Sequence, residues 1–142
     1  MRNSLLTSVI PTASTGQILG NVEAAEPISS NLYVRRTLAG EFVVVNSHLL
    51  DDLLERGLWS EALKDKIMAN RGSVKDLEEV PDDLKELYKT VWEIEQKVVI
   101  DMAADRGLFV DHSQSMNLFM ARPTPAGLSS ALVHAHKLGL KT

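Results

Sequence analysis

The chain has 142 residues, a formal net charge of −4 and no cysteine. The length suits one domain over residues 1–142, and the acidic balance argues against a nonspecific nucleic-acid binder, which normally carries a basic patch. Without cysteine, the chain has no disulfide, no thiolate zinc site and no thiol chemistry of its own. No apolar run could cross a bilayer and the start turns polar too soon for a signal peptide, so we expect a cytoplasmic protein without a membrane partner.

The first predicted elements are a strand and a loop. Residues Leu5 to Ile10 are mostly apolar and Pro11 follows at once, which predicts a short strand. The next segment, Thr12 to Gly16, is small and rich in hydroxyls. It predicts a tight loop that runs into a short helical turn.

Residues 32–45 predict a β-hairpin. Leu32, Val34 and Leu38 recur at even spacing, and Ala39-Gly40 supplies the turn. We expect the apolar face to continue on the return arm through Phe42 and Val44. Arg36 interrupts that face.

Three helices are predicted next. The first begins at Asn46 or Ser47 and ends at Gly57. The second covers about residues 60–72. The third and longest is expected to run over residues 81–106, because proline and two aspartates suit a first turn. Its expected buried face consists of Leu84, Leu87, Tyr88, Val91, Ile94, Val98 and Met102.

The last third of the chain predicts two strands and one helix. The apolar runs Leu108–Val110 and Met116–Met120 are candidate buried strands. Pro125-Ala126-Gly127 introduces a final helix from about Leu128 to Leu138.

The loop at Thr12–Gly16 is the segment most able to carry chemistry. Small residues let several N–H groups point inward, and the hydroxyls of Thr12, Ser14 and Thr15 add donors. With the amino end of a helix, these groups could bind a phosphate or diphosphate. No lysine follows in the manner of a P-loop. The alternative is that the hydroxyls only cap a helix.

Structural roles are expected for the other polar candidates. His134 and His136 are two residues apart, which on a helix points them in different directions and makes a poor metal pair. Asp82 and Asp83 suit a helix dipole better than acid catalysis. Surface, ion-pair or core roles are expected for His48, His112, Arg35, Arg36, Asp51, Asp52, Glu55, Trp59 and Trp92.

A collinear set of motifs covers nearly the whole chain: Arg2–Leu6, Pro11–Asn21, Ser30–Tyr33, Glu55–Trp59, Pro81–Ile94, Ala103–Gly107, Asp111–Asn117 and Gly139–Thr142. As a set they resemble the large, catalytic subunit of class I ribonucleoside-diphosphate reductases. The resemblance implies an α/β fold, mostly helical as a fragment, that is part of the second half of a ten-stranded α/β barrel. It also implies that Thr12, Ala13, Ser14 and Thr15 contact the substrate's diphosphate.

The resemblance further implies that the redox chemistry lies outside this chain. The family uses cysteines to form a thiyl radical and to reduce the sugar, and none is present here, so no catalytic residue is expected. The intact enzyme would need the remaining part of the large subunit, a radical-generating small subunit with a metal, and an external dithiol reductant. The chain itself would hold no cofactor and no metal. Residues 134–137 depart from the family, which often has aromatic residues there.

Two alternatives remain open at this point. The chain could be a noncatalytic module that binds a nucleoside diphosphate or a protein. It could instead be an inert remnant, because barrel strands without their neighbours expose unpaired edges that promote association. A homo-oligomer that covers such edges is one possible outcome.

Overall fold

The structure, a computed structural model, describes residues 4–10 and 12–141. Its contacts gather into two compact units. The terminal unit comprises Met1–Glu26 and Ile94–Thr142, and the central unit comprises Pro27–Glu93. The single domain expected over residues 1–142 stays a prediction. Within the described ranges, no helix is long and apolar enough to span a membrane.

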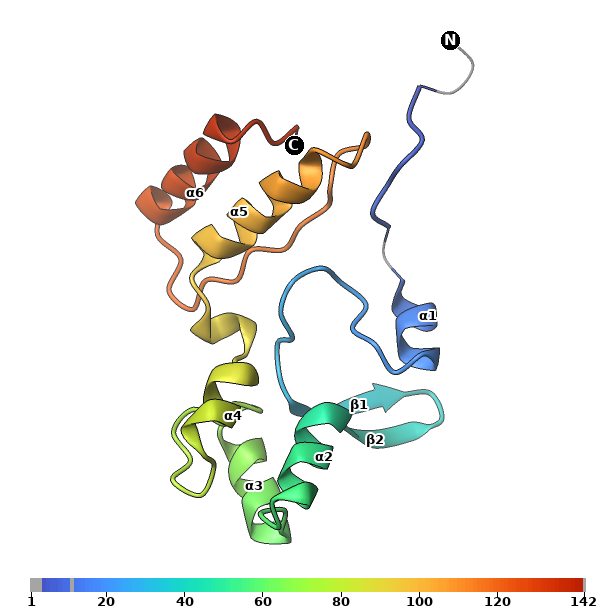
Figure 1. The fold of residues 1–142 in the computed structure, drawn as a ribbon, viewed down its shortest axis with the longest axis vertical. Coiled ribbons are helices and arrows are strands. Elements are labelled where there is room, and N and C mark those ends of the chain that lie inside the picture. Colours follow the sequence, from blue (N-terminus) through green and yellow to red (C-terminus); the bar gives the residue numbers. More distant parts are fainter. Residues whose placement is uncertain (1–3, 11, 142) are drawn as a thin grey trace. The chain divides into compact units, whose positions relative to one another are not determined.

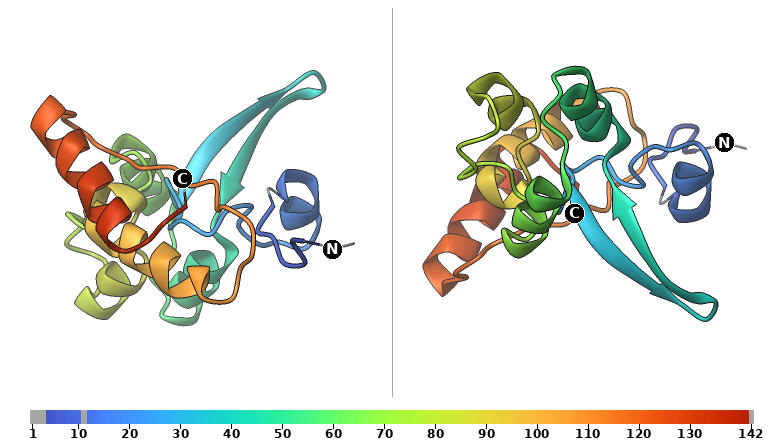
Figure 2. Two further views of the ribbon diagram at one scale, coloured as in Figure 1. Left: turned by 90° about the horizontal axis from the view of Figure 1, so that it is seen from above. Right: turned by 90° about the horizontal axis from the view of Figure 1, so that it is seen from below.

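The central unit begins with the predicted hairpin, which is confirmed. Strand β1 (Leu32–Thr37) pairs antiparallel with β2 (Gly40–Val45), and the ribbon extends away from the helices of its unit (Figure 2). Thr37 lies opposite Gly40, so the connecting turn consists of Leu38 and Ala39. This turn is one residue earlier than predicted.

The predicted face of the hairpin is wrong in its second arm. Leu32 lies opposite Val45, so odd-numbered residues of β2 share the face of Leu32. Phe42 and Val44 therefore lie on the other face. The reason is the position of the turn, because a shift of one residue in register moves every side chain to the opposite face.

The next two predicted helices are confirmed. Helix α2 covers Ser47–Glu55, and the side chain of Asn46 caps it by accepting from the His48 N–H at 3.2 Å. Helix α3 covers Glu61–Ala69, and the hydroxyl of Ser60 caps it by accepting from Leu63 N–H. Capping side chains of this kind satisfy backbone donors that have no partner in the first turn.

The single long helix predicted over residues 81–106 is wrong. It divides into α4 (Asp82–Leu87), the 3₁₀ turn η1 (Val91–Glu93) and α5 (Gln96–Gly107). Its predicted buried face divides too, because Leu87, Val98 and Met102 are exposed, whereas Leu84, Tyr88 and Val91 are buried.

Hydrogen bonds from elsewhere in the central unit explain the break after α4. The carbonyl of Tyr88 accepts from the Asn31 side-chain amide at 2.8 Å, and Val91 N–H donates to the carbonyl of Ile28 at 2.8 Å. A continuous helix would need both backbone groups for its own ladder. Tertiary contacts therefore override the helical periodicity at this point.

The hydrophobic core of the central unit lies between the helices and the base of β1. It is formed by Leu32, Leu49, Leu53, Leu63, Ile67, Val74, Leu77, Val80, Leu84 and Tyr88. Trp59 packs against this core, as expected. Trp92 does not confirm the same expectation, because about half of its surface is exposed (53%).

The terminal unit contains α1 (Ala13–Ile18), α5 and α6 (Pro125–Lys137), the last of which confirms the predicted final helix. Helices α5 and α6 lie side by side (Figure 1). His134 Nε2 of α6 lies 2.6 Å from Asp101 Oδ1 of α5. Among the described residues of this unit, the buried side chains come from α5: Val99, Ile100 and Ala103.

The strands predicted at residues 5–10, 108–110 and 116–120 are wrong, because the described part of each segment is irregular. Leu108 and Phe109 are also largely exposed rather than buried. A strand requires a neighbour to pair its backbone groups. The described residues offer these segments no such ladder, and Leu6 and Thr7 donate their N–H groups to the Asp111 carboxylate instead.

Candidate functional site

The predicted phosphate loop forms a single turn at the start of α1. Thr12 occupies the N-cap position with φ −125° and ψ 40°, and its hydroxyl makes no capping hydrogen bond. Its carbonyl accepts from Gly16 N–H at 2.6 Å, which closes the turn. The simple capping role for Thr12 is therefore not observed.

The residues of this turn lie at the surface of the protein. Thr12, Ala13, Ser14 and Thr15 are all exposed. The N–H groups of Ala13, Ser14 and Thr15 belong to the first helical turn, which has no intrahelical acceptor for them. Neither these N–H groups nor the three hydroxyls have a hydrogen-bond partner among the described residues. The structure thus brings the predicted residues together in one turn, and their donors have no partner in the part of the chain that it describes.

Gly16 lets the following chain fold back onto this turn. It is the buried residue of α1, and its carbonyl accepts from Asn21 N–H at 2.8 Å. A Cβ atom on Gly16 would lie 3.2 Å from the Cα of Glu23 and 3.3 Å from the carbonyl oxygen of Val22. Because both neighbours are backbone atoms, the close approach favours glycine here.

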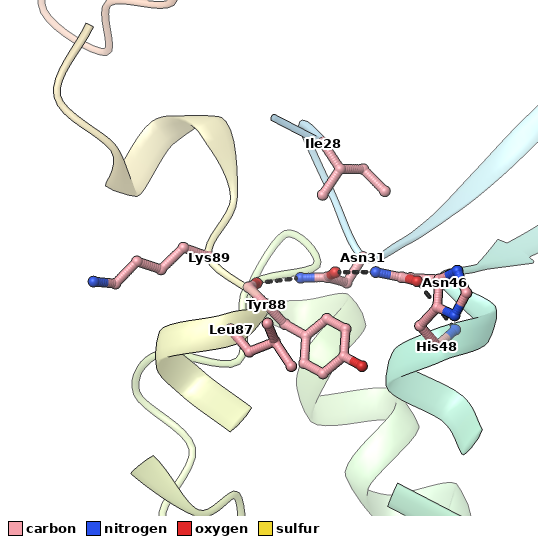
Figure 3. Close-up of a pocket in the computed structure, with 7 residues that line it drawn as sticks. All are labelled: Ile28, Asn31, Asn46, His48, Leu87, Tyr88 and Lys89. Atoms are coloured by element: carbon pink, nitrogen blue, oxygen red, sulfur yellow. Dashed lines mark hydrogen bonds between the residues drawn. The ribbon is translucent and has the colours of Figure 1, made fainter. Parts of the chain in front are cut away.

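A second candidate is a hollow of about 400 Å³ in the central unit (Figure 3). It is lined by Ile28, Asn31, Asn46, His48, Leu87, Tyr88 and Lys89. Figure 3 shows the side chains of Asn31 and Asn46 linked in a row that reaches the backbone of Tyr88. The polar part of the hollow is thus a hydrogen-bonded chain.

Asn31 lies at the centre of this row of hydrogen-bonded groups and is fully buried (0% exposed). Its amide group donates to the carbonyls of Gly72 at 3.1 Å and Tyr88 at 2.8 Å, and its side-chain oxygen accepts from Asn46 Nδ2 at 3.0 Å. Since these polar atoms already have partners, the arrangement supports structure rather than ligand binding. Sequence reasoning did not single out Asn31; its place directly before an apolar strand was the available signal.

Tyr88 also joins α4 to α2. Its hydroxyl donates to Asp52 Oδ2 at 2.5 Å, so Asp52 is more than part of a solvated helix face. Burial, together with the hydrogen bond to Asp52 and the negative charge of that carboxylate, raises the pKa of Tyr88 from 10 to about 12.

The raised pKa predicts an alkaline loss of stability. Because folding raises the pKa, the stabilisation is complete below pH 10 and is lost as the pH rises toward 12. Tyr88→Phe should lower stability below pH 10 and reduce the alkaline loss. Thermal unfolding between pH 8 and 12, followed by circular dichroism, measures both effects. Tyr33→Phe, at an exposed tyrosine, is the matched control, and equal pH profiles for the two variants would contradict the assignment.

Among the remaining charged candidates, Arg36, Asp82 and Asp83 form ion pairs. Arg36 Nε lies 2.7 Å from Glu41 Oε1 across the hairpin. Asp83, in the first turn of α4 as expected, also receives two hydrogen bonds from Arg56 at 3.0 and 2.6 Å. Within the described ranges, no three potential metal ligands lie together.

Comparison with known proteins decides the family. The family model described as "Ribonucleotide reductase, barrel domain" matches residues 1–142. The chain belongs to this family. The expected α/β class is thereby confirmed as a fragment of the ribonucleotide reductase barrel domain, with mostly helical elements and one hairpin.

Similar proteins include several ribonucleoside-diphosphate reductase large subunits. Those of Plasmodium falciparum (isolate Dd2) and Dictyostelium discoideum are each 60% identical over the whole chain, which covers 18% and 16% of their lengths. The solved alpha subunit of Actinobacillus ureae class Id ribonucleotide reductase matches 99% of this chain with 38% identity and a TM-score of 0.84. The chain covers 25% of that subunit. It therefore spans less than a fifth of the curated relatives named here.

Proposed function

We propose that this chain is the section of a ribonucleoside-diphosphate reductase large subunit that binds the substrate's diphosphate, in the cytoplasm. The observation that supports this role is the turn at the exposed residues Thr12, Ala13, Ser14 and Thr15, whose N–H groups and hydroxyls have no partner among the described residues. Such a turn at a helix start matches the donors that phosphate oxygens require. The resemblance to the family, drawn from the sequence, implies the same role for these four residues.

The contribution of the turn to the reaction is proximity. Holding the diphosphate fixes the position of the attached ribose, which turns an encounter between two groups into a reaction of aligned ones. The chain has no cysteine, so the thiol groups that reduce the ribose must come from the remaining part of the large subunit. A radical-generating small subunit with a metal, and an external dithiol reductant, complete the proposed enzyme.

The test uses a chimera in which residues 1–142 replace the matching segment of the Dictyostelium discoideum large subunit, which is 60% identical. The double change Ser14→Ala and Thr15→Ala should raise the KM for cytidine diphosphate by about 100-fold or more, since hydrogen bonds to charged groups each contribute roughly 1.5–3 kcal/mol. Steady-state reduction assays with the small subunit give the KM.

The matched control is Ser29→Ala with Ser47→Ala, which removes two exposed hydroxyls that make no hydrogen bond within the described residues. This control should keep the KM of the unmodified chimera. An unchanged KM in the Ser14 and Thr15 variant would contradict the proposed binding role.

The absence of cysteine also favours a noncatalytic role when the chain acts alone. In that case it would bind a nucleoside diphosphate without reducing it. Titration calorimetry of the 142-residue chain with cytidine diphosphate distinguishes this module from a remnant, which would show no binding at millimolar ligand.

A further inference from the structure

The segment before the diphosphate turn, as we call Thr12–Thr15, is hydrogen-bonded to residues of the terminal unit that are distant in the sequence. The N–H groups of Leu6 and Thr7 both donate to Oδ2 of Asp111, at 2.9 and 3.1 Å. The two bonds span 105 and 104 positions of the sequence, respectively. One carboxylate oxygen thus holds two consecutive backbone donors just upstream of the turn.

Thr7 makes three further hydrogen bonds to the same segment. Its hydroxyl donates to the carbonyl of Phe109 at 3.1 Å and accepts from Asp111 N–H at 2.9 Å. Its carbonyl accepts from His112 N–H at 3.2 Å. The backbone at Thr7 is therefore held through its donor, its acceptor and its side chain.

A second carboxylate ties down the chain after the turn. Glu26 Oε1 accepts from Asn117 N–H at 2.6 Å, across 91 positions. Thr7 and Glu26, which lie before and after the turn in the sequence, are therefore both bound to residues 109–117. Between these two residues, α1 is closed on itself by the bonds from Gly16 to Thr12 and from Asn21 to Gly16.

We propose that Asp111 and Glu26 are positioning residues that hold the diphosphate turn in its binding conformation. This inference rests on the proposed function and adds to it the two side chains that act on the turn from outside. Bonds between a carboxylate and backbone N–H groups are stronger than neutral ones. Fixing both ends of a loop also removes conformations that the free chain would otherwise sample.

Two further features of Asp111 agree with this role. The bonds from Leu6 and Thr7 N–H hold the pKa of its carboxyl below the ordinary value, so Asp111 carries its charge at neutral pH. The ammonium group of Lys141 donates to the carbonyls of Val110 and Asp111, which braces the acceptor segment from the carboxyl end of the chain.

The first experiment measures the order of the turn in the complete 142-residue chain. Asp111→Asn and Glu26→Gln each keep the side-chain shape but remove the charge. ¹⁵N relaxation should show the order parameters of residues 13–20 falling toward about 0.6 from about 0.85. Asp105→Asn, at an exposed carboxylate without a hydrogen bond or ion pair among the described residues, is the control and should leave them unchanged.

The second experiment measures what this order does for the substrate. In the chimera, each variant should raise the KM for cytidine diphosphate about 5- to 10-fold, because the turn must now be ordered during binding. The kcat should stay within about twofold, since the bound substrate restores the same geometry. A merely structural role would lower the amount of folded enzyme and thus kcat without changing KM.

The outcomes separate the two proposals. Unchanged order parameters in both variants would overturn the positioning role. So would a lower order with an unchanged KM, provided that the Ser14 and Thr15 double variant raises the KM. If that double variant also keeps the original KM, the diphosphate role itself is wrong, and the positioning role falls with it.

Discussion

Replacing Asn31 with leucine should lower the free energy of unfolding of the central unit by about 2–4 kcal/mol. Leucine has the same branched shape and the same number of side-chain heavy atoms, so the change removes the hydrogen bonds without leaving a cavity. The carbonyl of Tyr88 and the side-chain amide of Asn46 would lose the bonds that Asn31 gives them in a fully buried position. A buried polar group without a partner is destabilising by the free energy of its lost hydration.

Urea unfolding followed by circular dichroism measures this change. Asn46→Ala is the graded comparison, because it removes one bond to Asn31 and the cap of α2 but leaves both bonds from the Asn31 amide. It should destabilise by about 1 kcal/mol. If Asn31→Leu lowers the free energy of unfolding no more than Asn46→Ala does, the hydrogen bonds of Asn31 do not have the large stabilising effect expected here.

Gly72→Ala should also be strongly destabilising. Overpacking and backbone strain together should lower the free energy of unfolding by roughly 2–4 kcal/mol. Gly72 has φ +79°, a left-handed conformation that favours glycine. A Cβ atom at this position would lie 1.8 Å from Ser30 Oγ and 2.9 Å from Asn31 N. The substitution would therefore push Gly72 away from Asn31 and weaken the hydrogen bonds that Asn31 donates to the Gly72 carbonyl.

Gly57→Ala is the matched control for Gly72→Ala. Gly57 has a similar φ of +66°, but a Cβ atom there would meet nothing within 4 Å. It should therefore show the backbone strain alone, about 1 kcal/mol. Equal losses in the two variants, measured by the same urea unfolding, would mean that the close approach to Ser30 and Asn31 has no energetic consequence.

The sequence predicted the elements whose signals are local. Helices α2 and α3 carry capping residues, Asn46 and Ser60, directly before an apolar period, so the local and tertiary preferences agree. The helix over residues 81–106 failed because a hydrogen bond from Asn31, 57 positions away, takes the carbonyl of Tyr88. The predicted strands failed because strand formation depends on a neighbour that a single segment does not specify.

The candidate site was predictable to a similar extent. Small and hydroxyl-bearing residues at Thr12–Gly16 indicated a tight loop that runs into a short helical turn, and the structure has that turn. The binding of a diphosphate there stays a prediction. Periodicity could not identify Asp111 and Glu26 as its anchors, because their bonds cross 91 to 105 positions of sequence. Contacts of that span follow from the assembled fold rather than from a local pattern.

Because the helices are buried to different extents, the free energy of local unfolding differs along the chain. Helix α6 has no buried residue, whereas Leu53 of α2 and Ile67 of α3 are fully enclosed. Since α6 buries no residue of its own, we expect its detachment from α5 to require less than the global free energy of unfolding. We therefore expect α6 to fray on warming before α2 and α3, which melt only when the central unit unfolds as a whole.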